Sequence, residues 1–149
     1  MKKEVFLLKK TKWLAVLLAM VMVLTMVPMV SFAAEEGDTF TENGIHYRVT
    51  SDSTVAVISD TEDVTQHSTY TGEITIPATV SNGGTNYTVT AIDIIAFERS
   101  TVTKVTLPTT ITTIERQAFY DCKTVTEIVL NEGLISIDDD AFNGCTALE

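Results

Sequence analysis

The sequence predicts a mainly β protein in which most of the chain forms a solenoid of stacked repeats. Ala-Phe pairs begin at Ala96, Ala118 and Ala141, so successive copies are 22 and 23 residues apart. In every copy an isoleucine lies four residues before the alanine, and a second aliphatic residue lies seven before it. β-Branched residues dominate the segments between these pairs, and no long amphipathic helical pattern is present. A fixed period in the twenties is typical of a solenoid, in which each coil buries its apolar side against its neighbours.

Residues 1–33 have the pattern of a signal peptide. Five lysines precede an apolar run from Trp13 to Val30, and Ser31-Phe32-Ala33 places small residues at the positions that a signal peptidase reads. We expect cleavage after Ala33, so that the protein is secreted or displayed at the cell surface. The run is also close to the minimum length of a membrane span, and a retained membrane anchor is therefore the alternative.

The chain that remains after such cleavage is strongly acidic. Residues 1–33 hold five of the ten basic residues and one of the twenty acidic ones, which leaves residues 34–149 with a formal net charge of −14. Binding to phosphate groups requires clustered lysine and arginine. The composition therefore argues against nucleic acid and against an anionic membrane as partners, and it suits a protein outside the cell.

The exported part divides into three regions. Residues 34–39 are acidic and short of apolar groups, which predicts a disordered leader. Residues 40–70 predict a strand-rich cap, because the turn signal Asn43-Gly44 precedes a stretch that alternates apolar and polar residues. Residues 71–149 predict about two and a half to three rungs of the solenoid, truncated at the C-terminus. Each rung has two extended pieces, and the second of them ends just before Ala-Phe.

The two cysteines lie in the same phase of successive repeats. Cys122 and Cys145 each follow a phenylalanine by three residues, so stacked rungs would make them neighbours about 5 Å apart at Cα. That distance permits a disulfide. Equivalent side chains on adjacent rungs point the same way, however, which favours buried free thiols that act as small apolar spacers. Ser100 takes the equivalent position one repeat earlier and fits the same ladder of small residues.

Nothing in the sequence indicates catalysis, and we expect no catalytic residue, no cofactor and no metal. The histidines, His46 and His67, are not spaced with a serine and an acid as in a nucleophilic triad. The cysteines do not form a Cys-x-x-Cys pair. The densest acidic cluster, Asp138–Asp140, corresponds to Glu-Arg-Gln one repeat earlier. A calcium site needs at least five converging oxygen ligands, so we interpret this cluster as a solvated corner.

The full repeat consists of an aliphatic strand ending in leucine, a second aliphatic pair, Ala-Phe and a cysteine. Two copies carry it, Leu107–Cys122 and Leu130–Cys145. This pattern resembles the BspA-type leucine-rich repeat of bacterial surface and secreted proteins, and the match covers roughly residues 70–149. The copies depart from the family's pattern at Ser100 in place of cysteine and at Asn131 in place of proline. The resemblance implies a leucine-rich-repeat-like β-solenoid, preceded by the small strand-rich cap, with a parallel sheet along one face.

The resemblance also implies a binding face on the outside of that sheet. Repeat proteins commonly bind through such an extended surface. The alternative is that these positions are only solvated, with threonine favoured there by its strand propensity. The candidate residues are Thr103, Lys104, Thr106, Thr126, Glu127 and Val129.

Our leading hypothesis from the sequence is a non-catalytic secreted or cell-surface leucine-rich-repeat protein that mediates protein binding or adhesion. Its expected partner is an extracellular protein of a host or a neighbouring cell, with no nucleic acid and, after signal cleavage, no membrane. One alternative is the targeting arm of a larger exported enzyme whose catalytic domain lies downstream, and another is a carbohydrate-binding β-sandwich. Because residue 149 falls where the next inward strand should begin, we also expect this chain to be the N-terminal part of a longer protein.

Overall fold

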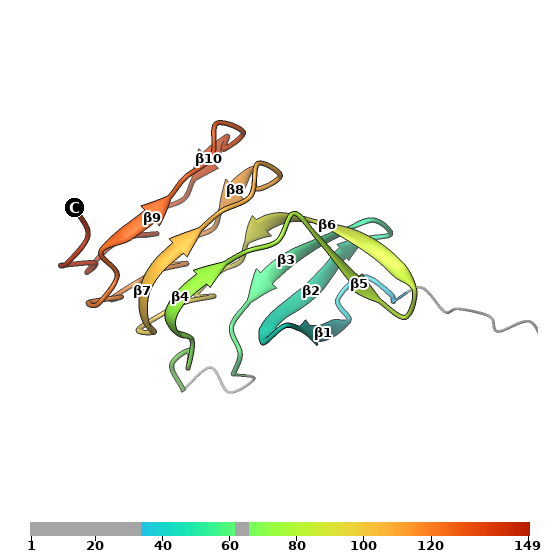
Figure 1. The fold of residues 1–149 in the computed structure, drawn as a ribbon, viewed down its shortest axis with the longest axis horizontal. Coiled ribbons are helices and arrows are strands. Elements are labelled where there is room, and N and C mark those ends of the chain that lie inside the picture. Colours follow the sequence, from blue (N-terminus) through green and yellow to red (C-terminus); the bar gives the residue numbers. More distant parts are fainter. Residues whose placement is uncertain (1–33, 62–65) are drawn as a thin grey trace, which may run out of the picture. The chain divides into compact units, whose positions relative to one another are not determined.

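The computed structural model describes residues 34–61 and 66–149, and within them it contains ten strands and no helix (Figure 1). The predicted signal peptide, residues 1–33, lies outside the described residues. The strands are β1 (Thr39–Glu42), β2 (Ile45–Ser51), β3 (Thr54–Ile58), β4 (Thr71–Thr75), β5 (Thr79–Asn82), β6 (Thr85–Ile92), β7 (Thr101–Thr106), β8 (Thr113–Ile114), β9 (Glu127–Val129) and β10 (Ser136–Ile137). One sheet has the order β1-β2-β3-β6-β8-β10, with β5 also paired to β6, and the other has the order β4-β7-β9.

The repeat region of the described chain makes three rungs, each with one strand in either sheet. Strands β4, β7 and β9 pair in parallel, and so do β6, β8 and β10. The registers place Ile92 beside Ile114 and Ile114 beside Ile137, so equivalent residues of successive repeats lie side by side. The predicted mainly β solenoid is therefore confirmed. The β-sandwich alternative is wrong, because a sandwich joins antiparallel Greek-key strands rather than parallel strands that stack in register.

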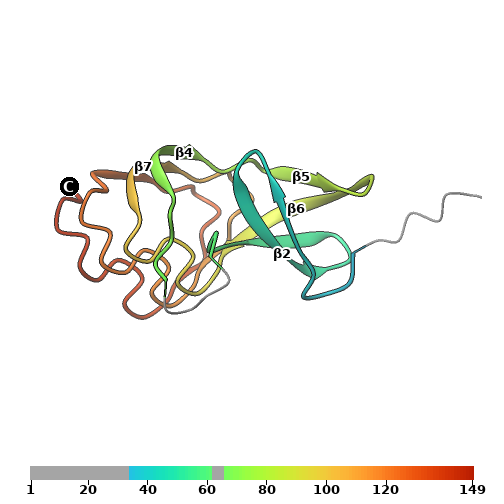
Figure 2. The same ribbon diagram turned by 90° about the horizontal axis from the view of Figure 1, so that it is seen from below.

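The cap extends the larger sheet past the first rung. Its strands β1, β2 and β3 are antiparallel, and β3 then pairs in parallel with β6, with Val57 opposite Ile92. Figure 2 shows the cap at the end of the rung stack opposite the C-terminus. Tyr47, Val55 and Val57 are fully buried, so the cap and the rungs share one hydrophobic core. The apolar edge of the first rung is thereby removed from water.

The segment 34–39 is not the disordered leader that its composition predicted. The Gly37 amide donates to the Val49 carbonyl at 2.9 Å, and the Val49 amide donates to the Asp38 carbonyl at 2.8 Å. Ala34 packs against the core, and β1 already begins at Thr39. Backbone pairing with β2 orders this segment, and backbone hydrogen bonding does not depend on the apolar content from which disorder was predicted.

Aromatic rings stack along the interior of the solenoid, as the recurring Ala-Phe pairs predicted. The ring centroids of Phe97 and Phe119 are 4.8 Å apart with an interplanar angle of 5°, and those of Phe119 and Phe142 are 5.4 Å apart at 18°. The cap side adds one more ring, since Tyr70 lies 4.9 Å from Phe97. Offset stacking of this kind stabilises a core beyond the area that it buries.

Each rung turns its corner with two residues whose φ angles are positive. The first precedes the alanine of the repeat, at Ile95 (φ 54°), Gln117 (58°) and Asp140 (58°). The second follows the phenylalanine by two residues, at Arg99 (53°), Asp121 (56°) and Gly144 (82°). The β-branched Ile95 is strained there, because the left-handed region brings its Cβ close to the backbone. Gly144 avoids a clash, since a Cβ at that position would lie 3.0 Å from Cα of Asp121.

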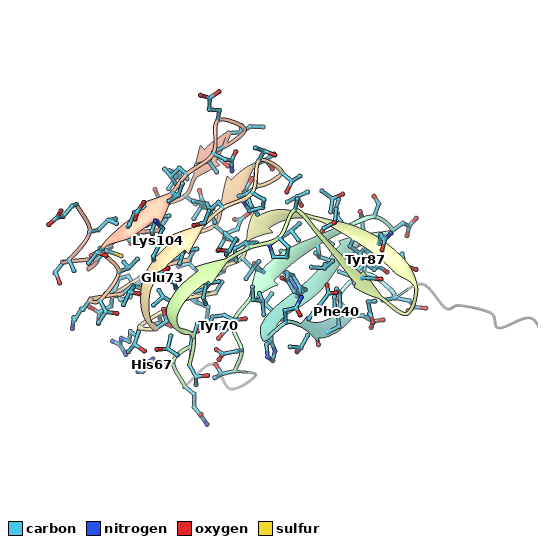
Figure 3. The ribbon with its side chains drawn as sticks, viewed as in Figure 1. Phe40, His67, Tyr70, Glu73, Tyr87 and Lys104 are labelled. Atoms are coloured by element: carbon cyan, nitrogen blue, oxygen red, sulfur yellow. The ribbon has the colours of Figure 1, made fainter. Side chains whose placement is uncertain are left out.

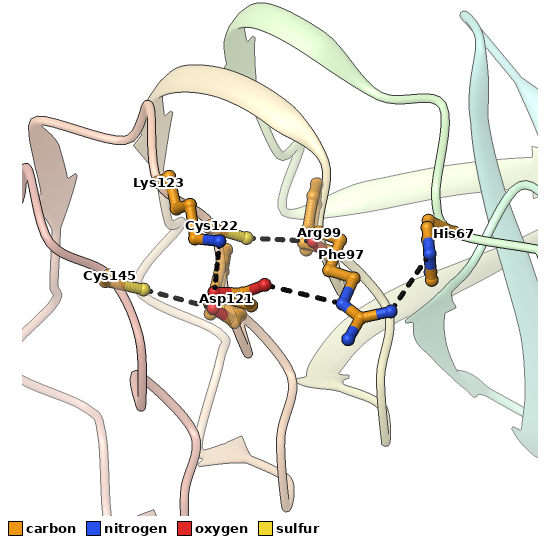
Figure 4. Close-up of polar contacts among 8 residues, drawn as sticks. His67, Phe97, Arg99, Asp121, Cys122, Lys123 and Cys145 are labelled. Carbon is orange, nitrogen blue, oxygen red and sulfur yellow. Dashed lines mark hydrogen bonds and ion pairs between the residues drawn. The ribbon is translucent and has the colours of Figure 1, made fainter.

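The cysteines are free and form a ladder beside the stacked phenylalanines (Figure 4). The Cys122 thiol donates to the Phe97 carbonyl at 2.9 Å, and the Cys145 thiol donates to the Phe119 carbonyl at 3.0 Å. Ser100 continues the ladder, with its Oγ 3.5 Å from Sγ of Cys122. The hydrogen bond with Cys122, together with burial, raises the pKa of the Cys145 thiol. These contacts agree with the free thiols that the sequence favoured.

Candidate binding face

The candidate binding face lies on the outside of the sheet β4-β7-β9 (Figure 3). Along β7, Val102 and Val105 are buried, whereas neither of the two residues between them is: Thr103 is exposed and Lys104 is half-buried. Strict alternation would turn one of these two inward. A bulge prevents this, because Gly72 pairs with Val102 and Glu73 pairs with Lys104, which leaves Thr103 as an extra residue without a partner on β4.

The structure brings the six predicted face residues together on β7, on β9 and at Thr126, the residue that precedes β9. Lys104 lies opposite Glu127, and Thr106 lies opposite Val129. The amide of Thr126 donates to the carbonyl of Thr103 at 2.9 Å, which places the remaining pair side by side. Lys104, Thr106 and Val129 are half-buried, and the other three are exposed.

A row of charged side chains crosses this face. Glu73, Lys104 and Glu127 occupy equivalent positions on the three strands, so the charges alternate as acid, base, acid. Nζ of Lys104 lies 2.7 Å from Oε2 of Glu127. The hydrogen bond from Lys104 to Glu127 raises the pKa of Lys104, and this outweighs the lowering of the pKa by desolvation; the charges of Glu127 and Glu73 raise it further. An exposed pair of this kind adds little stability, so its position is more informative than its energy.

Threonine hydroxyls on the face are tied to the backbone of the preceding rung. Oγ1 of Thr126 donates to the carbonyl of Thr103 at 3.1 Å, and Oγ1 of Thr124 donates to the carbonyl of Val102 at 2.8 Å. These bonds hold both threonine side chains in one orientation. The face is thus a pre-ordered surface whose side chains lose little entropy when a partner binds.

Two further residues of the face, Glu73 and Thr75, were not predicted from the sequence. Thr75 pairs with Thr106, and Glu73 pairs with Lys104. The sequence does contain the information needed to predict them. Ile76-Pro77 corresponds to Leu107-Pro108, and aligning the two stretches places Glu73 opposite Lys104. The first repeat departs from the others by carrying the β5–β6 hairpin between its two extended pieces, which masks this correspondence.

His67 and Asp140, which belong to the groups weighed from the sequence as catalytic or metal-binding candidates, make contacts within the corners of the rungs. Nε2 of His67 lies 3.0 Å from Nη1 of Arg99, which in turn pairs with Asp121 in the corner network of Figure 4. The carboxylate of Asp140 accepts a hydrogen bond from Asn143.

Among the described residues, no three His, Cys, Asp or Glu side chains gather closely enough to hold a metal ion. In residues 34–61 and 66–149, no helix has the length and apolar character needed to cross a membrane.

Asn131, the departure from the repeat pattern in which proline is usual, has a role of its own. Its Oδ1 accepts a hydrogen bond from the Gly133 amide at 2.6 Å, which forms a side-chain turn. Its Nδ2 donates to the Ile111 carbonyl of the preceding rung at 3.0 Å. Asparagine therefore replaces the rigidity of proline with two hydrogen bonds.

The parallel rungs, the phenylalanine ladder and the outward sheet define a repeat protein of the β-solenoid class. The family model of the BspA type leucine-rich repeat region matches residues 90–149. A leucine-rich repeat protein from Bacteroides capillosus is 33% identical, with a TM-score of 0.64 over 74% of this chain and 78% of that one. The chain belongs to the BspA-type leucine-rich repeat family. No curated protein matches it significantly.

Two longer proteins share the fold over a part of their length. A leucine-rich repeat protein from Bacteroides ovatus is 28% identical, with a TM-score of 0.63 over 74% of this chain and 28% of that one. A leucine rich cell surface protein from Faecalibacterium prausnitzii is 24% identical, with a TM-score of 0.60 over 76% of this chain and 30% of that one. The chain thus spans most of the B. capillosus protein and less than a third of these two.

Proposed function

We propose that this protein is a non-catalytic, secreted or cell-surface module that binds an extracellular protein of a host or neighbouring cell. The observation that carries the proposal is the candidate binding face, a three-stranded parallel sheet that presents charges and threonines outward in registered rows. Such a face offers a partner a flat surface built on strands, which position side chains more rigidly than loops do.

The charge row favours a partner of complementary pattern. Glu73 and Glu127 flank Lys104, so a partner with two basic groups around an acidic one would match the row. Electrostatic matching of this kind contributes mainly to specificity and to the association rate. The threonine methyl groups and Val129 supply the apolar contacts between the charges.

Export is part of the same proposal and rests on the sequence. The lysine-rich start, the apolar run and the small residues that end at Ala33 support a signal peptide, and the acidity of residues 34–149 suits an extracellular protein. Mass determination of the protein recovered from the culture medium or cell envelope tests this. We expect a mature N-terminus at residue 34, and an intact residue 1 would favour the membrane anchor instead.

Binding is tested with a set of purified extracellular matrix proteins immobilised for surface plasmon resonance. The variants Lys104→Glu and Glu127→Lys disturb the charge row, and each should weaken binding to the best partner by about tenfold. The double variant Lys104→Glu/Glu127→Lys keeps the ion pair, so it separates partner recognition from folding. Arg116→Glu is the matched control, because Arg116 is exposed at a corner and does not belong to the face.

Two outcomes would count against the sheet face. The first is binding that is unchanged in both single charge reversals and in Thr126→Arg, which places a large side chain on the face. The second is an Arg116→Glu effect as large as that of Lys104→Glu, because a general dependence on charge would then explain the loss.

A further inference from the structure

The first strand of the smaller sheet has an open edge. Strand β4 pairs with β7 on one side, and no described strand pairs with its other side. The larger sheet does not share this exposure, because β1, β2 and β3 continue it past the first rung. Within the described part of the chain, the cap therefore covers the N-terminal edge of the larger sheet and not that of the smaller one (Figure 1).

The backbone of β4 offers hydrogen-bonding groups along this edge. The Ile76 amide donates to the Thr106 carbonyl at 3.0 Å, and the Tyr70 carbonyl accepts from the Thr101 amide at 3.0 Å. Alternate residues of a parallel strand direct both of their peptide groups to the same side. The even-numbered residues of β4 therefore face β7, and Thr71, Glu73 and Thr75 direct their N–H and C=O groups to the open edge.

A cleft of about 490 Å³ lies beside this edge. One wall is formed by β4 itself, and the other is formed by the β1–β2 turn at Asn43-Gly44 and by the chain around Asp60 and Thr69. The two charged groups that line the cleft, Asp60 and Glu73, are both acidic, and no lysine or arginine is among its described lining residues. Hydrogen bonds from Ser68 and Thr69 hold the Asp60 carboxylate in place.

We propose that the open edge of β4 is a docking site for an extended, basic segment of a partner protein. The segment would add a strand to the sheet β4-β7-β9, with its backbone bonded to Thr71, Glu73 and Thr75. A lysine or arginine side chain of the segment would lie between Asp60 and Glu73. Strand addition of this kind draws affinity from main-chain hydrogen bonds and specificity from the side chains that flank them.

A second copy of this chain is a poor occupant of the same edge. Pairing of two β4 strands would bring two Glu73 side chains and two Asp60 side chains together in a protein that is already acidic. Like charge is one of the features by which proteins prevent self-pairing at an edge, and acidic groups attract a basic partner.

The site shares Glu73 and Thr75 with the candidate binding face, but it uses the backbone of the β4 edge and not the outward row of side chains, so the proposal does not rest on the proposed function. The probe is a synthetic heptapeptide with the sequence of Thr101–Leu107, which pairs with the opposite edge of β4 and carries a lysine. We expect millimolar peptide to shift the NMR amide resonances of Thr71, Glu73 and Thr75 and to slow their hydrogen exchange. A peptide with glutamate in place of its lysine should bind about tenfold more weakly, because like charges would then meet in the cleft.

Two controls test backbone pairing directly. A peptide with N-methylated alternate amides keeps its side chains but cannot pair, and its binding should be lost. In the protein, Thr75→Pro removes one edge N–H that is not used by β7, so the fold should tolerate it and the peptide should not bind. Thr75→Val is the matched variant, because it keeps the N–H and should bind normally.

Several results would overturn the proposal. Resonance shifts confined to β7, or to the outward side chains of the face, would show that the peptide binds elsewhere. Full binding by the N-methylated peptide would exclude strand addition. If Thr75→Pro does not fold, Glu73→Lys with the glutamate peptide decides the matter, because the reversed charges should restore the binding that each change weakens alone.

Discussion

The second and third rungs contain the same residue types in the same phase, yet their side chains differ in burial. Ile114 is 0% exposed, whereas its equivalent Ile137 is 47% exposed. Leu107 is 5% exposed and its equivalent Leu130 is 46% exposed. The first rung behaves like the second, since Ile92 is 0% exposed beneath the cap strand β3. A side chain in a solenoid is buried by the rungs on both sides, so equal sequences contribute unequal stability.

Truncation of the phenylalanine ladder should give the largest difference between these rungs. Phe119→Ala removes a ring that is fully buried between Phe97 and Phe142, and we expect a loss of about 3–5 kcal/mol in the free energy of unfolding. Phe142 is only partly buried, so Phe142→Ala should cost less than half as much. Urea denaturation followed by circular dichroism measures both, and equal losses would contradict the comparison.

Truncation of the repeated isoleucine should also destabilise the second rung more than the third, by a smaller amount than truncation of the phenylalanine. Ile114→Ala leaves a cavity inside the stack and should cost about 3 kcal/mol, whereas Ile137→Ala should cost about 1 kcal/mol because half of that side chain already meets water. Ile92→Ala is the informative control. A loss close to that of Ile114→Ala would show that the cap covers the first rung as well as another rung would.

A substitution at the strained corner residue Ile95 should increase the stability of the protein, unlike the two truncations above. Ile95 has a φ of 54°, a conformation that asparagine adopts more readily than a β-branched residue does. Ile95→Asn should therefore stabilise the protein by about 1 kcal/mol. Gly144→Ala is the converse test and should destabilise, because its Cβ would meet the backbone of Asp121. A loss of stability in Ile95→Asn would mean that the isoleucine side chain outweighs the strain.

Acidification should destabilise the cap side of the protein before the last rung. We expect this to be the smallest of the four effects on stability. Burial alone would raise the pKa of Asp60, but hydrogen bonds from Thr69 and Ser68 outweigh it and lower that pKa below the ordinary value of 3.8. The stabilisation from Asp60 is therefore complete above pH 3.8 and is lost as the pH falls through the lower folded value. Amide exchange around Thr69 should accelerate in that range, and in Asp60→Asn it should already be fast at neutral pH. Acceleration at Ile137 first would contradict this order.

Much of the fold was predictable because stacking repeats a single set of contacts. The phase of Ala96, Ala118 and Ala141 was enough to predict the rungs and the phenylalanine ladder. The common phase of the two cysteines favoured free thiols over a disulfide. The same reasoning placed Lys104 beside Glu127. Glu73 was not predicted, because the β5–β6 hairpin interrupts the period in the first repeat. The order of residues 34–39 was not predicted either, since composition does not report backbone pairing with β2.

The period of the chain predicted the class of protein and the strands that carry the candidate face, because both depend on contacts between equivalent residues at a constant separation. The residues of the repeat motif predicted the family by their resemblance to it. The tertiary structure was needed to show that the cap covers the edge of the larger sheet and leaves the edge of β4 open. It was also needed to separate the buried Ile114 from the exposed Ile137. Both results depend on what lies beside a strand in space, and a repeating sequence is the same whether or not a neighbour is present.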